Sequence, residues 1–253
     1  MTEALPGLVF QAVLVLARIG GAAMLLPGIG AAEVPATIRL ALALTLTALL
    51  LPVAAPGLPP LPGEVPEVLR LLATETAIGL WLGLLARLVE LALAQAGQIM
   101  ALMIGLASPL QADPAFGAQG TALSRLFGLV AVMLVLSTGL YALPLRALAE
   151  SYALLPAGGA LPVPSQAAVL AQAVADSLSL ALRLAAPLLL AGILGQFALG
   201  LLSRLAPTMP AFVLLAPGQI LAGLLLLALV LPALLDTWLA AARDGFGALP
   251  GLG

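Results

Sequence analysis

The sequence predicts an all-α membrane protein with about six long apolar helical segments, some of them broken. Of its 253 residues, 63% are hydrophobic and only 8% are charged, compared with about 25% charged residues in soluble domains. Apolar runs of about 20 residues, the length that crosses a bilayer, recur along the chain. A soluble fold of this size could not cover so much apolar surface. We therefore expect one integral membrane domain over residues 1–253 that contacts membrane lipid.

The first three apolar segments are expected in the N-terminal half of the chain. They run from about Leu8 to Leu26, from about Ile38 to Ala55, and from about Val68 to Leu106. The connection PGLPPLPGEVPE precedes the third segment. We expect it to be non-helical, because its prolines cannot continue a helix. The third segment is unusually long for a single crossing.

Three further segments are expected in the C-terminal half. They run from about Leu123 to Leu143, from about Leu178 to Leu202, and from about Phe212 to Leu235. Asp176 and Ser177 are predicted to cap the fifth helix, because short polar side chains accept hydrogen bonds from the first turn. Asp244, Gly245 and the closing ALPGLG are predicted to form a short frayed tail.

Composition excludes several kinds of chemistry. There are no cysteines and no histidines, which rules out disulfides, thiolate zinc sites and histidine-dependent hydrolysis. The net charge of −2 provides no basic patch for nucleic acid. We expect no metal and no cofactor.

Small residues recur every four positions in two parts of the third segment. Such stripes let helix backbones approach closely in a membrane. The residues predicted to pack in this way are Gly79, Gly83, Gly97 and Ala101, with Gly105 continuing the second stripe. Gly192, Gly195 and Gly200 give the fifth segment a similarly thin face.

Charged residues inside apolar runs need partners, because an unpaired charge in the membrane costs several kcal/mol, about 2.5–3.5 on insertion scales. They are Arg18, Glu75, Arg87, Glu90 and Arg183. Internal salt bridges are the favoured interpretation, because Arg87 and Glu90 are three residues apart and share a helix face, and Arg146 and Glu150 have i,i+4 spacing in the same way. A proton or ion pathway through Glu75 and Glu90 is the alternative.

Two polar segments interrupt the apolar runs of the chain. Ser108 to Gly120 is rich in Gly, Pro and Gln, and is either a surface loop or a re-entrant element. In GLLSRLAPTMPAF, Arg204 stands where a cation complements a helix C-terminus, and Pro207 and Pro210 prevent continuation. The pattern predicts a tight helical hairpin oriented by Arg204.

The string RLAAPLLLAGILGQFALGLLSRLAPTMPAFVLLAPGQILAG, Arg183 to Gly223, resembles the signature region of the FliR family, with Pro187, Gly200, Arg204 and Pro207 in matching positions. Three further strings match in order: RIGGAAMLLPGIG, AGQIMALMIGLASPLQADP and ESYALLPAG. The last contains Ser151 and Tyr152, and the first begins at Arg18. Gly139-Leu140 departs from the Gly-His that is frequent in the family.

The resemblance implies a core subunit of the flagellar type III protein export gate in the bacterial inner membrane, at the flagellar basal body. FliR-like proteins assemble with FliP-like and FliQ-like subunits, with helical hairpins packed on these partners, and an FlhB-like switch protein docks on the assembly. Unfolded exported proteins pass through the channel, and no covalent chemistry occurs, so no enzyme activity is expected.

The resemblance also assigns roles to residues of this chain. The loop after the long third helix projects into the channel as part of a plug, with Phe116 as the obstructing side chain. The plug candidates are Gly105, Ser108, Asp113, Pro114, Phe116 and Gly117, and the hairpin-shaping candidates are Arg204, Pro207 and Pro187.

Two alternative functions remain open at this point. The homologous subunit of a virulence injectisome differs little in sequence from the flagellar one. A stand-alone secondary transporter would also use broken helices with glycines near a substrate site. The absence of a paired inverted repeat and of a convergent polar site in the sequence argues against the transporter.

Overall fold

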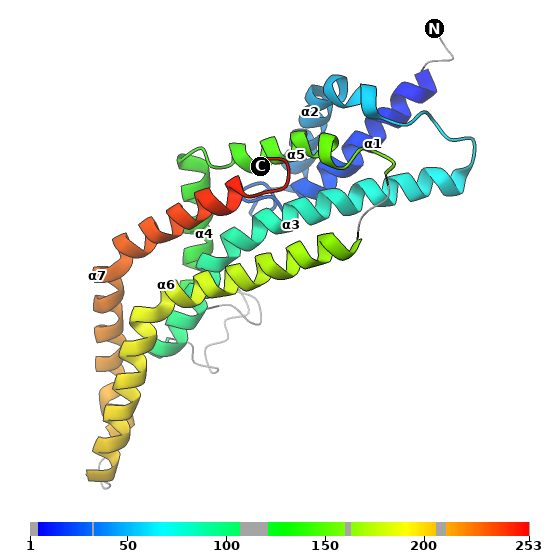
Figure 1. Ribbon diagram of the computed structural model, residues 1–253. Coiled ribbons are helices and arrows are strands. Elements are labelled where there is room, and N and C mark those ends of the chain that lie inside the picture. The colour runs from blue at the N-terminus through cyan, green and yellow to red at the C-terminus, as the bar shows by residue number, and fades with distance from the viewer. Residues whose placement is uncertain (1–4, 32, 107–120, 160–162, 206–210, 253) are drawn as a thin grey trace. The chain divides into compact units, whose positions relative to one another are not determined.

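The structure, a computed structural model, describes residues 5–31, 33–106, 121–159, 163–205 and 211–252. Within these ranges every regular element is a helix (Figure 1). In chain order they are α1 (Leu5–Ala23), α2 (Ala36–Ala54), the short 3-10 helix η1 (Ala55–Gly57), α3 (Val65–Ile104), α4 (Ala122–Ser137), α5 (Ala142–Leu154), α6 (Val163–Leu205) and α7 (Ala211–Gly247). Five of these helices are long and apolar enough to cross a membrane, or six spans if the bent pair α4 and α5 counts as one. The predicted all-α membrane fold is confirmed.

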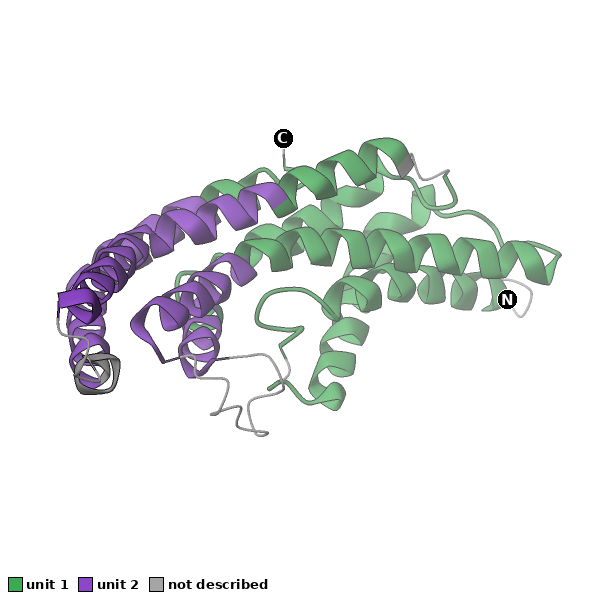
Figure 2. Ribbon diagram, turned by 90° about the horizontal axis from the view of Figure 1, so that it is seen from below, with its two compact units in different colours: residues 1–89, 132–174, 243–253 green, residues 90–131, 175–242 purple. Residues whose placement is uncertain are grey.

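The chain divides into two compact units, coloured separately in Figure 2. Unit 1 comprises residues 1–89, 132–174 and 243–253, and unit 2 comprises residues 90–131 and 175–242. Four helices, α3, α4, α6 and α7, contribute residues to both. The units are described separately below, and the single integral domain stays a prediction.

The first two helices of unit 1 are joined by a non-helical connection that Arg39 stabilises. Its Nε donates to the carbonyl oxygen of Ile29 at 3.2 Å, and its Nη2 donates to those of Ala31 at 3.0 Å and Val34 at 3.3 Å. Irregular backbone at membrane depth must find its hydrogen-bond partners inside the protein. One side chain in the first turn of α2 supplies three of them.

The predicted fourth span, Leu123 to Leu143, is wrong as a continuous helix. α4 ends at Ser137 and α5 begins at Ala142, with a bend of 71° between them. Gly139 lies between them with φ +76°, a left-handed conformation that ends helices and that glycine adopts without a steric penalty. The apolar composition continues through this turn, so hydropathy alone could not reveal it.

The predicted start of the fifth helix at Leu178 is also wrong. α6 begins at Val163, so Asp176 and Ser177 lie inside it and do not cap it. Pro164 falls in the first turn, where its missing N–H costs nothing. The alanine-rich stretch that follows has high helix propensity and carries the helix through the two polar residues.

The C-terminal residues are packed, so the predicted frayed tail is wrong. α7 continues to Gly247, well past the expected end at Leu235. In unit 1, Phe246 is fully buried and Leu249 is 6% exposed. A Cβ atom on Gly251 would lie 3.1 Å from the carbonyl oxygen of Ala147 in α5, so the tail contacts α5 closely.

Candidate functional site

Arg18 of α1 is the centre of a buried polar cluster in unit 1. The side chain of Arg18 is fully buried, and the side chain of Glu75 on α3 is only 1% exposed. Nε of Arg18 donates to Oε2 of Glu75 at 2.7 Å, and Nη2 donates to Oε1 at 3.2 Å. This is the two-pronged arrangement in which a guanidinium holds a carboxylate most strongly.

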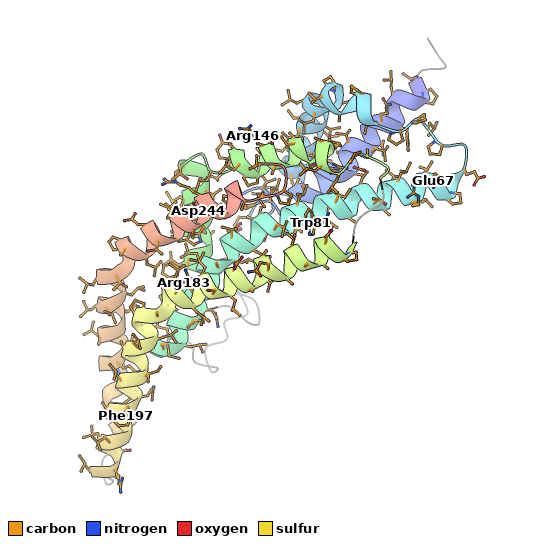
Figure 3. All side chains as sticks on the ribbon, in the orientation of Figure 1. Glu67, Trp81, Arg146, Arg183, Phe197 and Asp244 are labelled. Carbon is orange, nitrogen blue, oxygen red and sulfur yellow. The ribbon has the colours of Figure 1, made fainter. Side chains whose placement is uncertain are left out.

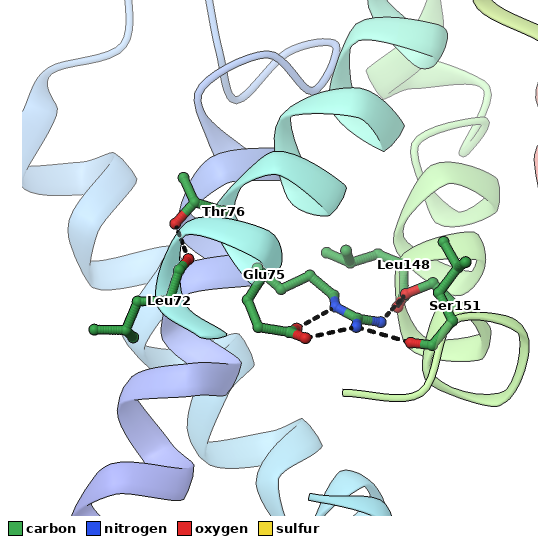
Figure 4. Close-up of polar contacts among 7 residues, drawn as sticks. Leu72, Glu75, Thr76, Leu148 and Ser151 are labelled. Carbon is green, nitrogen blue, oxygen red and sulfur yellow. Dashed lines mark hydrogen bonds and ion pairs between the residues drawn. The ribbon is translucent and has the colours of Figure 1, made fainter. Parts of the chain in front are cut away.

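The same guanidinium also reaches α5. Nη1 of Arg18 donates to Oγ of Ser151 at 3.1 Å, and Nη2 donates to the carbonyl oxygen of Leu155 at 2.8 Å. Ser151 in turn donates to the carbonyl oxygen of Leu148 at 2.7 Å, as Figure 4 shows. The ring of Tyr152 lies 4.0 Å from the guanidinium carbon, within cation–π range. Arg18 therefore binds two helices and the carbonyl that follows the end of α5.

The sequence indicated that Arg18 and Glu75 needed partners, but it could not pair them. They are 57 residues apart, and Arg18 and Ser151 are 133 residues apart. The useful signal was that two of the strings with family resemblance contained Arg18 and Ser151. Because Glu75 is held by Arg18, the structure favours a salt bridge at this position over the alternative ion pathway.

Glycines allow α1 and α3 to approach closely beside this cluster. A Cβ atom on Gly79 would overlap the backbone oxygen of Arg18, and one on Gly83 would lie 2.7 Å from the backbone oxygen of Ala22. From the other side, a Cβ atom on Gly21 would lie 2.7 Å from the backbone oxygen of Thr76. Gly79 and Gly83 thus lie against a helix of the same chain.

In unit 2, Gly97 and Ala101 lie on the buried side of α3. A Cβ atom on Gly97 would lie 2.9 Å from the carbonyl oxygen of Leu123 on α4 and 2.7 Å from the ring of Phe127. Ala101 is fully buried. The two small residues lie within the packed interior of the unit.

Gly105 ends α3 with φ +84°. The N–H of Leu106 donates to the carbonyl oxygen of Ala101 at 2.9 Å, and the N–H of Gly105 donates to that of Leu102 at 3.3 Å. These two bonds are the Schellman pattern, which satisfies carbonyls at a helix C-terminus and requires a residue in the left-handed region. The polar segment therefore begins from a defined helix end.

The start of α4 is equally defined. Oγ1 of Thr121 accepts a hydrogen bond from the N–H of Ser124 at 3.2 Å, the geometry of an N-cap. Both the N–H and the hydroxyl of Thr121 donate to Oε1 of Gln98 on α3, at 3.1 and 3.0 Å. The predicted plug residues Ser108, Asp113, Pro114, Phe116 and Gly117 lie between these two ends, outside the described residues.

A groove of about 380 Å³ lies in unit 2 where the end of α3 meets α6 and α7. Its lining residues are Met103, Ile104, Leu188, Ala191, Gly192, Gly195, Leu199, Gly218, Gln219, Ala222, Gly223 and Leu226. The only polar side chain in this lining is Gln219, whose Nε2 donates to the carbonyl oxygen of Met103 at 3.2 Å. The groove is thus an apolar surface and holds no cluster of polar groups that could bind a charged solute.

The glycines around the groove are of two kinds. A Cβ atom on Gly192 would lie 3.0 Å from the side chain of Met103, and one on Gly223 would lie 2.6 Å from that of Ile104. A Cβ atom on Gly195 or Gly218 would have no atom of the described chain within 4 Å. The first pair packs inside the unit, and the second pair faces open space.

The hairpin candidates are placed only in part. Arg204 lies in the last turn of α6 and is exposed, Pro187 lies inside α6, and Pro207 is outside the described residues. Gly200 is exposed, and a Cβ atom there would meet no described atom within 4 Å. The roles of these four residues stay predictions.

Other charged groups have structural roles. The predicted pair of Arg146 and Glu150 is confirmed, with Nε donating to Oε1 at 2.6 Å. Among the described residues, no group of three or more Asp, Glu, His or Cys side chains could hold a metal ion.

Comparison with known proteins identifies the family. The family described as "Bacterial export proteins, family 1" matches residues 9–244. The "Flagellar biosynthetic protein FliR" of Caulobacter vibrioides is 34% identical over 230 residues, which cover 91% of this chain and 92% of the relative. The protein of the same name from Escherichia coli is 32% identical over 206 residues, 79% of this chain and 76% of the relative.

A relative with a different name matches a shorter part of the chain. The "Yop proteins translocation protein T" of Yersinia pestis is 32% identical over 152 residues, which cover 59% of this chain and 58% of the relative. The family match extends over nearly all the helices described above, including the Arg18 cluster and the groove. The chain is therefore a multi-pass membrane protein that belongs to family 1 of the bacterial export proteins, the family that includes the FliR proteins.

Proposed function

We propose that this protein is a core subunit of the flagellar type III protein export gate in the bacterial inner membrane, at the flagellar basal body. It helps to form and close the channel through which unfolded flagellar proteins leave the cytoplasm. It acts without covalent chemistry, as a structural part of an assembly with FliP-like and FliQ-like subunits, on which an FlhB-like protein docks.

The observation that carries this proposal is the apolar surface of α6 and α7. Their most apolar windows are 22% and 11% buried within the chain, compared with 50% for α3. Phe197 on α6, labelled in Figure 3, is 75% exposed, and Leu229 on α7 is 78% exposed. Such a surface requires either lipid or other protein chains to cover it.

Helix length favours protein partners for part of this surface. With 43 and 40 residues, α6 and α3 have contour lengths of about 65 and 60 Å, about twice the 30 Å hydrocarbon core of a bilayer. Lipid alone cannot cover apolar helices of this length. Further apolar helices from neighbouring subunits would cover the remainder.

The flagellar relatives favour the flagellar system over the injectisome. The FliR match from Caulobacter vibrioides covers 91% of the chain, whereas the Yop translocation protein match covers 59%. The groove in unit 2 argues against a stand-alone transporter, because its single polar side chain, Gln219, is already bonded to the backbone of α3.

Purification with partners tests the proposed assembly. We expect that the tagged protein, extracted from its native membrane in mild detergent, brings FliP-like and FliQ-like subunits with it. Mass spectrometry identifies these subunits and assigns them to a flagellum or an injectisome. Recovery of the chain alone or as a homo-oligomer, from cells that make such a system, would overturn the proposal and favour a transporter.

Within this function, we propose that the segment from Gly105 to Gly120 closes the channel and that Phe116 obstructs it. The defined ends of α3 and α4, which Gly105 and Thr121 provide, support a segment held at fixed points on both sides. Phe116→Ala, or deletion of Ala115 to Gly117, should make the assembled gate leak ions, which conductance in planar bilayers would detect. Tyr141→Ala is the control, because it removes an exposed ring between α4 and α5, outside the proposed plug and the surface of α6 and α7, and should cause no leak. A tight gate with Phe116→Ala, in a fully assembled complex, would refute the plug.

We also propose that Arg204, with Pro207 and Pro187, shapes the connection between α6 and α7 for contact with neighbouring subunits. A cation in the last turn of a helix stabilises that helix end by about 0.3–1 kcal/mol, which supports an orienting role. Arg204→Ala should lower the yield of the purified assembly, and a normal yield would remove this role.

A further inference from the structure

α1 and α3 of unit 1 are parallel and keep one register. Leu14 and Leu71 belong to one buried cluster, Arg18 is bonded to Glu75, and a Cβ atom on Gly79 would lie 3.0 Å from the backbone nitrogen of Ala22. Each of these pairs is separated by 57 residues, as the Arg18 and Glu75 bond is. The contacts therefore run in the same order along both helices.

The glycine contacts fix the distance between the two helices, but the glycines of α3 do not by themselves fix their register. Glu75, Gly79 and Gly83 follow one another at four-residue spacing, so they share one face of α3. If α1 moved forward by one turn, about 5.4 Å, the backbone oxygen of Arg18 would leave Gly79 and face Gly83, which the backbone oxygen of Ala22 contacts in the native register. The glycine face of α3 offers a small residue in both positions, whereas on α1 the shift would put Ala17 in place of Gly21 beside the backbone oxygen of Thr76.

The hydrogen bonds of Arg18 can form in only one of these two positions of α1. After such a shift, the guanidinium would face Gly79, which offers no side-chain acceptor, and the Glu75 carboxylate would be left buried beside Leu14. Separating the partners of a buried ion pair is strongly destabilising, because each charge is left in the interior without compensation. The bonds to Ser151 on α5 and to the carbonyl oxygen of Leu155, which follows α5, would be lost in the same shift.

We propose that Arg18 is the positioning residue that sets the register of α1 on α3 and α5, and that it does so through its forked guanidinium. This inference does not rest on the proposed export function, because it concerns contacts inside one chain. Its acceptors lie on two different elements and point to a single planar group, an arrangement that a lysine ammonium cannot reproduce.

Cysteine cross-linking in the full chain, in its native membrane, tests this inference directly. The protein has no cysteines, so introduced pairs are the only thiols. Leu14→Cys with Leu71→Cys forms the native-register disulfide. Pro6→Cys with Leu71→Cys forms the shifted-register disulfide, because Pro6 lies one turn before Phe10, which already shares a buried cluster with Leu14 and Leu71 in the native register. Disulfides form only when the Cα atoms are within about 7 Å, and neither pair alters Arg18 or Glu75, so the ratio of the two yields reports the register.

With Arg18 present, we expect the native-register disulfide to form efficiently. With Arg18→Leu, which leaves no unpaired cation, its yield should fall several-fold, and the yield of the shifted-register disulfide should rise by a similar factor. An unchanged ratio of the two yields with Arg18→Leu would overturn the inference, because packing alone would then set the register.

Arg18→Lys separates geometry from charge and also serves if Arg18→Leu does not accumulate in the membrane. Lysine keeps the charge beside Glu75, but its three N–H donors share one nitrogen and cannot make the four bonds that Arg18 makes from three nitrogens. An intermediate or low yield of the native-register disulfide supports the forked guanidinium as the determinant. A yield equal to that with Arg18 would overturn this part of the inference.

Discussion

The crossing of α1 and α3 and the pair formed by α6 and α7 use glycine for opposite purposes. At the crossing, Gly79 and Gly83 are covered by the backbone of α1, and the adjacent charges are bonded to one another. On α6 and α7, Gly195 and Gly218 face open space in an apolar groove. Similar small-residue patterns therefore indicate internal packing at the crossing of α1 and α3, and at Gly195 and Gly218 an apolar surface that the described chain leaves open.

The largest effect should come from breaking the buried ion pair. Glu75→Ala leaves Arg18 buried without its carboxylate and should lower the free energy of unfolding by about 3–5 kcal/mol. Thermal unfolding of the purified chain in detergent, followed by tryptophan fluorescence, measures this. Glu67→Ala is a matched control on the same helix, because Glu67 also binds an arginine with both oxygens, at 2.6 and 2.9 Å, but is exposed. The control should leave the unfolding midpoint nearly unchanged, because water and salt screen an exposed ion pair. Equal losses of unfolding free energy in Glu75→Ala and Glu67→Ala would show that the buried ion pair stabilises the protein no more than the exposed one.

A smaller loss should follow from one added methyl group at the crossing. Gly79→Ala places a Cβ atom on the backbone of Arg18, which cannot move without shifting α1, and overpacking of this kind costs about 1–3 kcal/mol. Gly195→Ala adds the same methyl group where the described chain has no neighbour, and it should be neutral or slightly stabilising. The two unfolding midpoints give the comparison. If both substitutions were neutral, the close approach of α1 and α3 would not be required for stability.

Filling the groove should have the smallest effect on the stability of the chain itself. It should, however, clearly lower the yield of the assembly. Gly195→Leu fills space that a partner helix would occupy, so the yield of FliP-like and FliQ-like subunits in the purification should fall. The unfolding free energy of the isolated chain should stay within about 0.5 kcal/mol of its original value. Gly200→Leu is the control, because Gly200 is exposed on the same helix but does not line the groove. A normal yield of these subunits with Gly195→Leu would indicate that lipid, and not a partner helix, covers the groove.

Sequence reasoning succeeded where the physical signal is local and failed where it depends on distant residues. Apolar length identified the membrane helices, and four-residue spacing identified Gly79 and Gly83 as packing residues and Arg146 with Glu150 as a pair. The turn at Gly139 was missed because hydropathy does not respond to a left-handed backbone in an apolar run. The start of α6 was missed because polar residues inside a long helix imitate a cap.

The polar cluster around Arg18 shows the same limit. Each of its charged members was recognisable as a residue that needed a partner inside an apolar run. The choice of partner depends on how α1, α3 and α5 pack, and that is determined by glycine contacts between segments far apart in sequence. One sequence without its packing cannot select among the available carboxylates.

The parallel arrangement of α1 and α3 has a consequence for membrane topology. α1, α2 and α3 are each long and apolar enough to cross a membrane, so if all three cross it, α1 and α3 enter from the same side and α2 is the return crossing. If both helices cross the membrane, the proline-rich connection before Val65 and the N-terminal end of α1 share one compartment. A single accessibility label in that connection would fix the sidedness of the N-terminal half.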